Sequence, residues 1–488
     1  MLLRGGLVAR PGKEKPEALD IRIAEGRFAE LRSGMRPLAG EAPLDLEGLM
    51  VLPGGIDSHV HFDTPGFTER EDFLHGSAEA ARGGITTVID MPCTSLPPLT
   101  SVAHLEYKLR AIQGMALVDY GLYGGLHGKI PGETYGLSYL EDTIRSLAPQ
   151  VLGFKAYLLS GMETFPRLTH EALKRAIHGC AQQGRPLLLH AEDADYVSGA
   201  TERIRERCQA GAPGGGADGT GGATWDDYVD SRPEAAELVA VAAAIQLAGP
   251  DTGMLHIVHV GTAAAAALAH DAGATCETCT HYLAFTREDF ATKGSSLKTA
   301  PPVKEAHNRD QLWQYLAEGV IDFVTSDHAP ARLEEKRTGS VWTDYGGIPG
   351  VGTTYPYLFS EGYLAGRLSL DRLQELMAGA KARRFGIADR KGALETGLDA
   401  DFVVMDPAGG SILRGSDLFS KGKDTPFEGM ELRGALVGTW LRGKAVYLNP
   451  SIPPLKGSSI NMNILDGPYP DLRGIMVSGG YGHTIRRC

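Results

Sequence analysis

Short apolar runs alternate with amphipathic stretches along most of this chain. The run at 151–159, for example, is followed by a stretch in which Leu173, Ile177 and Cys180 lie on one helical stripe that ends at Gly184. Alternation of this kind predicts a parallel sheet, and eight strands are the number that closes an α/β barrel. We therefore predict an α/β fold, a (β/α)8 TIM barrel, with strands at 54–63, 85–91, 116–126, 151–159, 186–191, 254–260, 274–283 and 321–327.

The pattern changes at both ends of the chain. Residues 1–52 contain short strands broken by turns, and residues 398–447 return to strands of the same texture. We expect the two ends to build one small β-sandwich domain, from residues 1–52 and 391–450. The catalytic barrel, residues 53–390, would then be inserted between them.

Two further segments have no regular periodicity. Residues 209–224 are too rich in glycine to pack, and we interpret them as a flexible loop before a helix at 233–247. Two alternatives stay open for this loop, a surface insertion and an active-site lid. The C-terminal tail, 451–488, is rich in glycine and proline, and we expect it to lie on a surface, with a subunit interface as one alternative.

Composition excludes several classes of protein. The net charge of -12 and the lack of a Lys/Arg cluster argue against nucleic acid as a partner. No apolar run approaches the ~20 residues that span a bilayer, and the N-terminus lacks the features of a signal peptide. Six cysteines in 488 residues do not make a disulfide framework, so we expect a cytoplasmic protein without membrane partners. Cys276 and Cys279 lack a second pair at zinc-binding spacing, and we predict that they pack within a strand.

Polar residues interrupt the apolar strands near their carboxyl ends, where the function of an α/β barrel is located. His59 and His61 are two residues apart, so both imidazoles leave the same face of a strand and converge on one point. Each of these residues alone has an ordinary structural explanation, such as a buried histidine with satisfied hydrogen bonds. Together they favour a metal site, and the full set is His59, His61, Lys155, His190, His259 and Asp327.

Lys155 is the hardest of the six to explain structurally. It lies between Phe154 and Ala156 in a strand predicted to be buried, so it must be either desolvated or chemically changed. A neutral amine can add carbon dioxide to give a carbamate, whose two oxygens can bridge two cations. Four imidazoles, one carbamate and one carboxylate then predict a site for two divalent metal ions. Nitrogen and oxygen donors without thiolate favour zinc, with cobalt, manganese or iron as alternatives.

Six motifs, taken in order, resemble those of the cyclic-amidase branch of the amidohydrolase superfamily: HVH, GFKAYL, LLLHAE, IVHVGT, ETCTHYL and TSDHAP. That branch contains dihydroorotases, hydantoinases or dihydropyrimidinases, and allantoinases. The resemblance runs from about residue 53 to 447. It implies a metal-dependent hydrolase that opens the ring of a small-molecule cyclic amide or ureide, and a homo-oligomer, either a tetramer or a dimer.

The same resemblance assigns roles to residues. It implies that the six polar residues are the metal ligands, that Lys155 is carboxylated, and that Asp327 carries the proton from the attacking water to the leaving nitrogen. His256 competes with His259 on the same strand, but His259 matches the motif and His256 lies on the opposite face. His281 is expected to contact the ligands at most, and not the metal.

The position two residues after the second histidine bears on the substrate. Dihydroorotases normally have arginine there, which holds the carboxylate of their substrate, whereas this chain has Asp63. An acidic residue repels an anionic substrate, so we expect Asp63 to bind a different ring.

Several other stretches resemble allantoinases, including SGMETFPRLT, LKTAPPVKEAHNRDQLW, WDDYVDSRPEAAE and KGALETGLDADFVVMDP. We therefore rank the conversion of allantoin to allantoate, a reaction of purine catabolism, first, and hydantoins or dihydropyrimidines second. The chain departs from the allantoinase pattern in FDTPGFTERED and at Thr94, where allantoinases tend to have asparagine. A non-catalytic relative that uses the barrel as a scaffold is the alternative from a different class. Such relatives typically lose ligands, whereas this chain has the full set.

Overall fold

Eight parallel strands follow one another along the middle of the chain and close into a barrel. We describe them from a computed structural model, which covers residues 1–41, 43–130, 132, 134–136, 138–210, 222–453, 455 and 469–487. Strands β8 and β9 are two halves of one barrel strand, interrupted at Tyr123. The bounds are β6 Gly55–Val60, β7 Ile85–Asp90, β8 Asp119–Leu122, β9 Gly124–Gly125, β10 Phe154–Tyr157, β11 Leu187–His190, β12 Leu255–Ile257, β13 Thr275–Cys279 and β14 Phe323–Thr325.

Hydrogen bonds between the first and last strands complete the barrel. Consecutive strands pair in parallel from β6 to β8 and from β9 to β14. Val60 then forms a parallel bridge with His328, and the His61 N–H donates to the His328 carbonyl at 2.8 Å. The predicted (β/α)8 barrel is therefore confirmed, and Cys276 and Cys279 both lie buried in β13.

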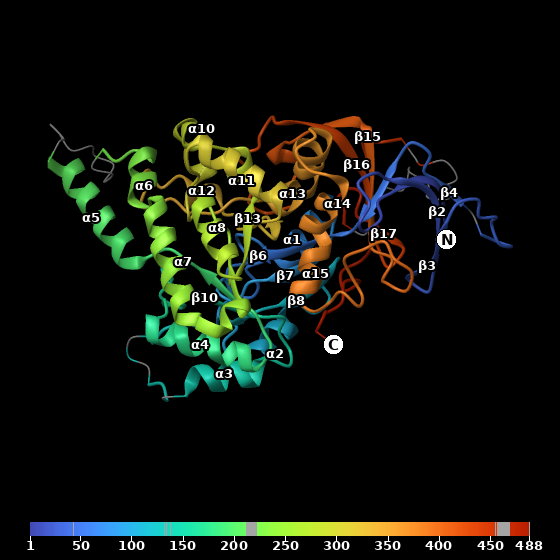
Figure 1. Cartoon of the computed structure of the whole chain (residues 1–488). Coiled ribbons are helices and arrows are strands. Elements are labelled where there is room, and N and C mark those ends of the chain that lie inside the picture. The colour runs from blue at the N-terminus through green and yellow to red at the C-terminus, as the bar shows by residue number, and fades with distance from the viewer. Residues whose placement is uncertain are drawn as a thin grey trace.

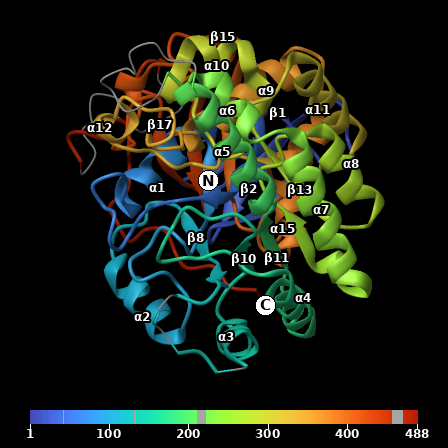
Figure 2. The same cartoon turned by 90° about the vertical axis from the view of Figure 1, so that its left-hand side faces the viewer.

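Helices surround these strands, as Figure 2 shows from the side of α5 and α6. Several begin with a side-chain cap: Asp72, Ser101 and Thr169 accept backbone N–H groups at the starts of α1, α2 and α4. The α-helices are α1 Phe73–Arg82, α2 Val102–Ala111, α3 Tyr139–Leu147, α4 His170–Gln182, α5 Ala194–Ala210, α6 Trp225–Ser231, α7 Glu234–Ala248, α8 Ala263–Asp271, α9 Thr280–Ala284, α10 Arg287–Lys293, α11 Ala306–Glu318, α12 Leu333–Lys336, α13 Val351–Tyr357, α14 Leu370–Gln374 and α15 Ala380–Arg384. Short 3-10 and π segments add η1 Gly249–Met254, η2 Gly294–Leu297, η3 Leu358–Leu364, η4 Glu375–Gly379 and η5 Gly415–Asp417.

The two ends of the chain form one further sheet, in which the blue and red strands of Figure 1 lie side by side. Its order is β17-β16-β15-β5-β1-β2-β3, with β4 paired to β1, and the antiparallel pair β5–β15 joins the two ends. The strands are β1 Leu2–Val8, β2 Glu17–Ala24, β3 Arg27–Arg32, β4 Pro43–Asp45, β5 Met50–Pro53, β15 Phe402–Ile412, β16 Glu431–Leu441 and β17 Lys444–Leu448.

This sheet curls on itself, because its edge strand β3 meets the segment before β15. The Phe28 N–H donates to the Leu398 carbonyl at 3.0 Å, and residues from both ends share one apolar core that contains Phe28, Phe402 and Trp440. The small β-sandwich domain built by both ends is therefore confirmed. The exact limits of 1–52, 391–450 and 53–390 stay a prediction.

A buried ionic cluster joins the barrel to this β domain. Lys391 Nζ lies 2.7 Å from Asp119 at the start of β8, 3.1 Å from Asp399 and 2.5 Å from Asp401. Arg442 pairs with the other oxygen of Asp119 at 2.5 Å. Arg390 also pairs with Asp399, at 2.7 Å. Basic side chains thus already satisfy these three carboxylates, so the cluster is a structural junction and not a cation site.

The described part of the C-terminal tail, 469–487, alternates exposed and buried side chains, as expected of a segment that lies on a surface. Its inward-facing side chains, Leu472, Ile475, Val477 and Ile485, are buried. The Ile485 N–H donates to the Tyr120 carbonyl at 2.7 Å, which holds the segment against β8. Residues 211–221 of the glycine-rich loop and 456–468 of the tail lie outside the described residues. In the rest of the chain, none of the helices has both the length and the apolar character needed to cross a bilayer.

Candidate metal centre

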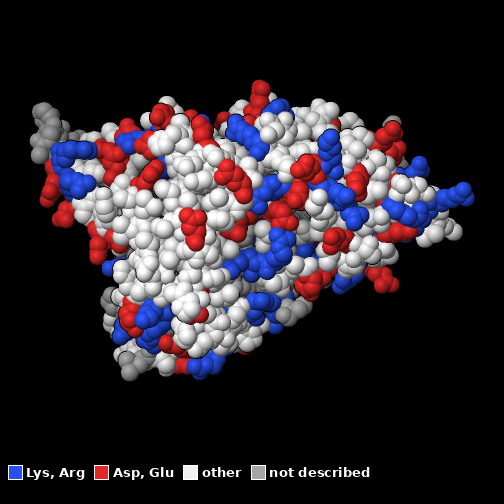
Figure 3. Space-filling view, viewed as in Figure 1, with Lys and Arg blue, Asp and Glu red and all other residues white. Residues whose placement is uncertain are grey.

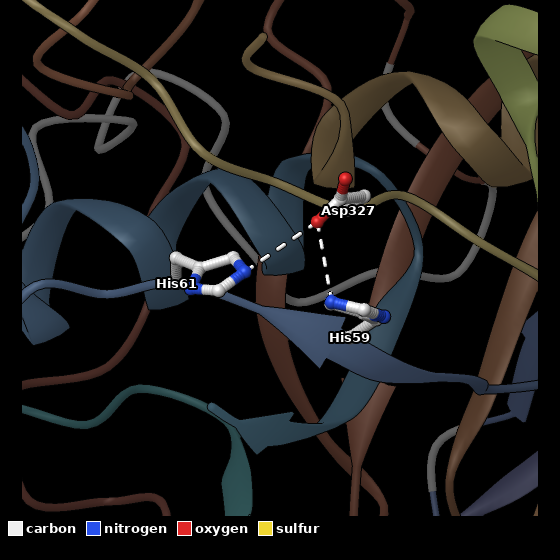
Figure 4. Close-up of side chains that lie close together, drawn as sticks. All are labelled: His59, His61 and Asp327. Carbon is white, nitrogen blue, oxygen red and sulfur yellow. Dashed lines mark ion pairs between the residues drawn. The ribbon is translucent and has the colours of Figure 1, made fainter. Parts of the chain in front are cut away.

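Three of the six predicted ligands meet at one carboxylate oxygen. His59 lies in β6 and directs its side chain into the barrel. His61 follows directly after that strand, and Asp327 lies two residues after β14 (Figure 4). Asp327 Oδ1 lies 3.2 Å from His59 Nε2 and 3.4 Å from His61 Nε2. The two histidines thus converge, as the spacing predicts, and the closing strand of the barrel brings the carboxylate to them.

Hydrogen bonding fixes the tautomer of His59. Its Nδ1 lies 2.5 Å from Glu277 Oε1 in β13. An ionised carboxylate only accepts, so Nδ1 must carry the proton and Nε2 must present a lone pair towards Asp327. Burial lowers the pKa of His59, so the ring stays neutral. Burial raises the pKa of Glu277, but its contacts with His59 and His256 lower that pKa to about 2. Two acceptor atoms therefore face each other across 3.2 Å, an arrangement that a cation would stabilise.

His190 and His259 form a second group of candidate ligands. His190 Nε2 lies 2.9 Å from Glu192 Oε2, which places its proton on Nε2 and leaves Nδ1 as a lone pair. That Nδ1 lies 3.0 Å from His259 Nε2. Burial lowers the pKa of both histidines, that of His259 well below its usual value. Both rings are therefore neutral and available as ligands.

Lys155 lies beside both groups. Its Nζ is fully buried, 4.8 Å from the centre of the Tyr157 ring, and that ring stacks on His190 with centroids 5.1 Å apart. Among the described residues Nζ has no hydrogen-bond partner. Burial lowers the pKa of Lys155 to about 8, so a substantial fraction of neutral amine exists near neutral pH. An unpaired, partly neutral amine is the state that reacts with carbon dioxide.

The electrostatics of His61 and Asp327 are coupled. Burial lowers the pKa of His61, but the Cys93 thiol at 3.9 Å and the Asp327 carboxylate raise it to about 10. Burial raises the pKa of Asp327, but the two imidazoles beside it hold that pKa well below its usual range. A proton on His61 therefore helps to balance the charge of Asp327, together with the protonated fraction of Lys155, and a metal cation would take the place of the His61 proton.

Backbone conformation supports a functional role for this region. Asp63, His259 and Asp327 have φ values of 46°, 39° and 49°, in the left-handed region that residues other than glycine rarely adopt. Strain of this kind costs of order 1–3 kcal/mol per residue and concentrates at functional sites. All three follow barrel strands at their carboxyl ends.

The donor set fits two divalent cations. It offers imidazole nitrogens and a carboxylate around two focal points, with buried polar atoms that lack partners at His59 Nε2 and Lys155 Nζ within the described part of the chain. Nitrogen and oxygen donors without a coordinating thiolate match zinc and its neighbours in the first transition row. We call His59, His61 and Asp327 the first cation site, and His190 and His259 the second. Lys155 lies beside both.

His256 and His281 belong to neither group of candidate ligands. His256 lies 2.7 Å from Thr275 Oγ1 and 3.2 Å from Glu277 Oε2, and so contacts the glutamate that holds His59. His281 is fully buried, burial lowers its pKa to about 4, and neither ring nitrogen has a partner in the described ranges. Asp63 is also buried, and burial raises its pKa to about 7. Neither of its oxygens has a hydrogen-bond partner among the residues that the structure covers.

Three charged residues near the centre were absent from the sequence prediction: Glu277, Glu192 and Arg232. Glu277 holds His59, and Glu192 holds His190. Glu277 carries the same signal as Lys155, a charged residue in the middle of a buried strand, and could have been found by it. Arg232 Nη1 donates to Glu192 Oε2 at 2.6 Å from a distant turn between α6 and α7, and no sequence pattern indicates this contact.

Comparisons with known proteins show the family of this chain. The model of the amidohydrolase family matches residues 50–446. An allantoinase from Rubrobacter xylanophilus is 36% identical over 453 residues, which cover 92% of this chain and 94% of that protein. An allantoinase from Saccharomyces cerevisiae is 33% identical and covers 82% of this chain and 83% of that protein.

Among solved structures, the L-hydantoinase (dihydropyrimidinase) from Arthrobacter aurescens has a TM-score of 0.84 at 28% identity, covering 100% of this chain and 99% of that one. A D-hydantoinase from Bacillus sp. AR9 has a TM-score of 0.81 at 26% identity, covering 100% and 98%. The likeness therefore extends over the barrel and the β domain together.

Proposed function

This chain belongs to the amidohydrolase family and is a hydrolase that acts on cyclic amides, and from that premise we propose that its substrate is allantoin and its product allantoate. The observation that carries this choice is the similarity to allantoinases over most of the chain. The retention of all six ligand-type side chains at one end of the barrel supports catalysis over a scaffold role.

Two cations, most simply zinc, would be held by this chain's own residues. The first would bind His59, His61 and Asp327, the second would bind His190 and His259, and a carbamate on Lys155 would lie between them. Bound there, divalent cations polarise the amide carbonyl and lower the pKa of a water molecule towards neutrality.

Asp327 is the group that moves the proton. Its carboxylate is ionised over the physiological range, because the neighbouring imidazoles hold its pKa well below the usual value. It can therefore accept the proton of the attacking water and return that proton to the ring nitrogen as the C–N bond breaks. The ring opens to a carboxylic acid and a free urea nitrogen, and the acid then loses its proton to solvent to give the carboxylate, so atoms and charges balance.

Asp63 is our candidate for holding the substrate. It is two residues beyond His61, and both of its buried oxygens lack partners in the described residues. A carboxyl group accepts hydrogen bonds, and a ureide such as allantoin offers several N–H donors. A dihydroorotate carboxylate would instead meet a repulsive group.

Hydantoins or dihydropyrimidines are the second candidate substrates. The structural likeness to hydantoinases over the whole chain favours this alternative. Hydantoin has the same five-membered ring as allantoin without the ureido group, so the same centre would open it. Allantoin and hydantoin differ only in the exocyclic group that the site must bind, whereas a dihydropyrimidine also has a six-membered ring.

A panel of initial rates separates these candidates. The protein is loaded with zinc in the presence of bicarbonate, and ring opening is measured for allantoin, hydantoin, dihydrouracil and dihydroorotate. We expect the highest kcat/KM for allantoin. A higher value for hydantoin or dihydrouracil would favour the second candidate, and a preference for dihydroorotate would contradict the role assigned to Asp63.

We also expect a homo-oligomer, a tetramer or a dimer, in the cytoplasm. An uncharged area extends over α7 and α8 in Figure 3, and the outer side of α7 includes Val239, which is 47% exposed, with Ala242 and Gln246 on the same side. Two copies that each carry a net charge of -12 would repel less through such a face than through the charged remainder of the surface. Sedimentation velocity measures this state directly.

A further inference from the structure

We propose that Arg232 is a positioning residue for the second cation, acting through Glu192 to hold His190 with its Nδ1 directed at that cation. This inference rests on the two-cation site of the proposed function. It adds a residue that lies outside the ligand set and outside every motif from which that set was recognised.

One carboxylate oxygen links the three residues. Glu192 Oε2 accepts from His190 Nε2 at 2.9 Å and from Arg232 Nη1 at 2.6 Å. Because the same oxygen receives both donors, a shift of the guanidinium moves the acceptor that orients the imidazole. Charge-assisted contacts of this length are the strongest hydrogen bonds that side chains form.

Both side chains are largely shielded from water. The Glu192 side chain is 1% exposed and that of Arg232 is 17% exposed, so water does not readily replace the guanidinium. The orientation of a ligating histidine is typically set by a partner on its other ring nitrogen, and losing that partner costs 10- to 100-fold in metal affinity. Glu192 is that partner for His190.

Neighbouring residues hold Arg232 in turn. Lys304 Nζ donates to the Arg232 carbonyl at 2.5 Å, and the guanidinium lies 5.6 Å from the centre of the Tyr228 ring. The Tyr228 hydroxyl donates to the Thr299 carbonyl at 3.0 Å. These contacts connect the turn between α6 and α7 to residues 299–304, between η2 and α11, and hold Arg232 beside Glu192.

The first cation site has a different support. Glu277 contacts His59, His256 and Ser58, and no Lys or Arg forms an ion pair with it in the described part of the chain. The effect of Arg232 should therefore be confined to the second site. A loss of cation affinity at the second site alone would therefore indicate positioning by Arg232, because general destabilisation would weaken both sites.

The test compares zinc binding by metal-free wild type, Arg232→Gln, Arg232→Lys and Arg287→Gln, titrated in bicarbonate buffer at one pH. Arg287 is the control, because it is an ion-paired arginine of the same region whose partners are Asp226 and Asp230, and not Glu192. We expect wild type and Arg287→Gln to bind two zinc ions alike. In Arg232→Gln the first ion should bind as in wild type and the second 10- to 100-fold more weakly, with partial recovery in Arg232→Lys.

Cobalt reports the same effect by spectroscopy. With Co²⁺ as the probe, the visible absorption that grows with the first equivalent should match wild type, and only the second should change. If Arg232→Gln fails to fold, as judged by near-ultraviolet circular dichroism, Glu192→Gln is measured instead, with the same expected loss at the second site.

The outcomes separate this inference from the proposed function. If wild type binds fewer than two ions, the two-cation site itself is wrong. If wild type binds two and Arg232→Gln binds both with unchanged affinity and spectrum, the positioning role of Arg232 is overturned and the two-cation site stands. Equal weakening at both sites would also overturn it, because it would indicate a general structural effect.

Discussion

Lys155 is the residue on which the two-cation arrangement depends. It is fully buried beside both groups of ligands, its amine lacks a partner in the described residues, and burial lowers its pKa to about 8. Lys155→Ala should therefore reduce bound zinc below two equivalents and lower kcat by about 100-fold or more, the scale of losing a ligand-orienting group. Short carboxylic acids should restore part of the activity, because they can replace the carbamate.

Metal content by mass spectrometry and the initial rate with allantoin measure both effects. Lys336→Met is the matched control: Lys336 is a buried lysine that donates to the Gly347 carbonyl and, within the described residues, forms no hydrogen bond or ion pair with any of the six candidate ligands. Full activity in Lys155→Ala would refute the bridging role.

At this scale the sequence pointed to the candidate ligands, whose role stays a prediction, but not to the side chains that hold them. Two histidines two residues apart and a lysine inside an apolar strand are local patterns, and the structure brings them to the same end of the barrel. Glu192 and Glu277 were missed because their roles depend on which ring nitrogen they face. For Glu277, the contact with His59 arises only when β13 and β6 are brought together in the barrel, and its charge within a buried strand is the local signal that marks it. For Glu192, two residues after His190, the sequence does not show that the two side chains turn towards each other.

The first helix after the histidine strand provides a prediction at the scale of one element. Asp72 caps α1, where its Oδ1 accepts from the His75 N–H at 2.9 Å, and its Oδ2 lies 3.1 Å from Lys421 Nζ. Burial raises the pKa of Asp72, but the contacts with His75 and Lys421 bring it down to about 2. The folded pKa is below that of the unfolded chain, so the charge stabilises the fold above pH ~4, and this contribution is lost as the pH falls towards ~2.

Asp72→Asn keeps an acceptor for the helix but removes the charge. We expect the free energy of unfolding, measured with urea, to fall by about 1–2 kcal/mol at pH 7, and the difference from wild type to shrink as the pH falls below ~4. Asp142→Asn on α3, where the side chain is 55% exposed, serves as the control and should change stability little. An Asp72→Asn variant with a constant deficit down to pH ~3 would contradict the assigned pKa.

Elements with clear periodicity were predicted well, and irregular ones were not. All eight barrel strands lie within their expected ranges, because buried parallel strands are short apolar runs between helices. For the tail at 469–487 the sequence predicted a place on a surface but not which side chains face inwards. An irregular segment has no period that marks which side chains face inwards, and the burial of Ile475 and Ile485 depends on the surfaces of β17 and β8 that they meet.

At the scale of the whole molecule, Lys391 is the connection between barrel and β domain. It forms ion pairs with three buried carboxylates. In the described structure, Arg442 forms an ion pair with only one of the three, Asp119. Removing one partner of a buried ion pair typically costs 3–5 kcal/mol. Lys391→Met should therefore lower the free energy of unfolding by about that amount while leaving kcat unchanged at temperatures where the variant is folded.

Urea unfolding and the rate with allantoin test this together. Arg390→Met is the control, because Arg390 contacts Asp399 from a partly exposed position and should cost less than about 1 kcal/mol. Wild-type stability in Lys391→Met would show that the cluster does not hold the two domains together. The contribution of both chain ends to one β domain was predictable from their similar texture. Its attachment through Lys391 was not, because the cluster combines residues nearly 300 positions apart.

Catalysis by two cations is the central claim, and a zinc titration followed by turnover tests it most directly. Metal-free protein in bicarbonate receives zinc in fractions of an equivalent, and the rate of allantoin ring opening is measured at each step. We predict negligible turnover without metal and full activity as the second equivalent binds. Full activity of the metal-free protein, or no hydrolysis of any cyclic amide at two bound equivalents, would contradict the account.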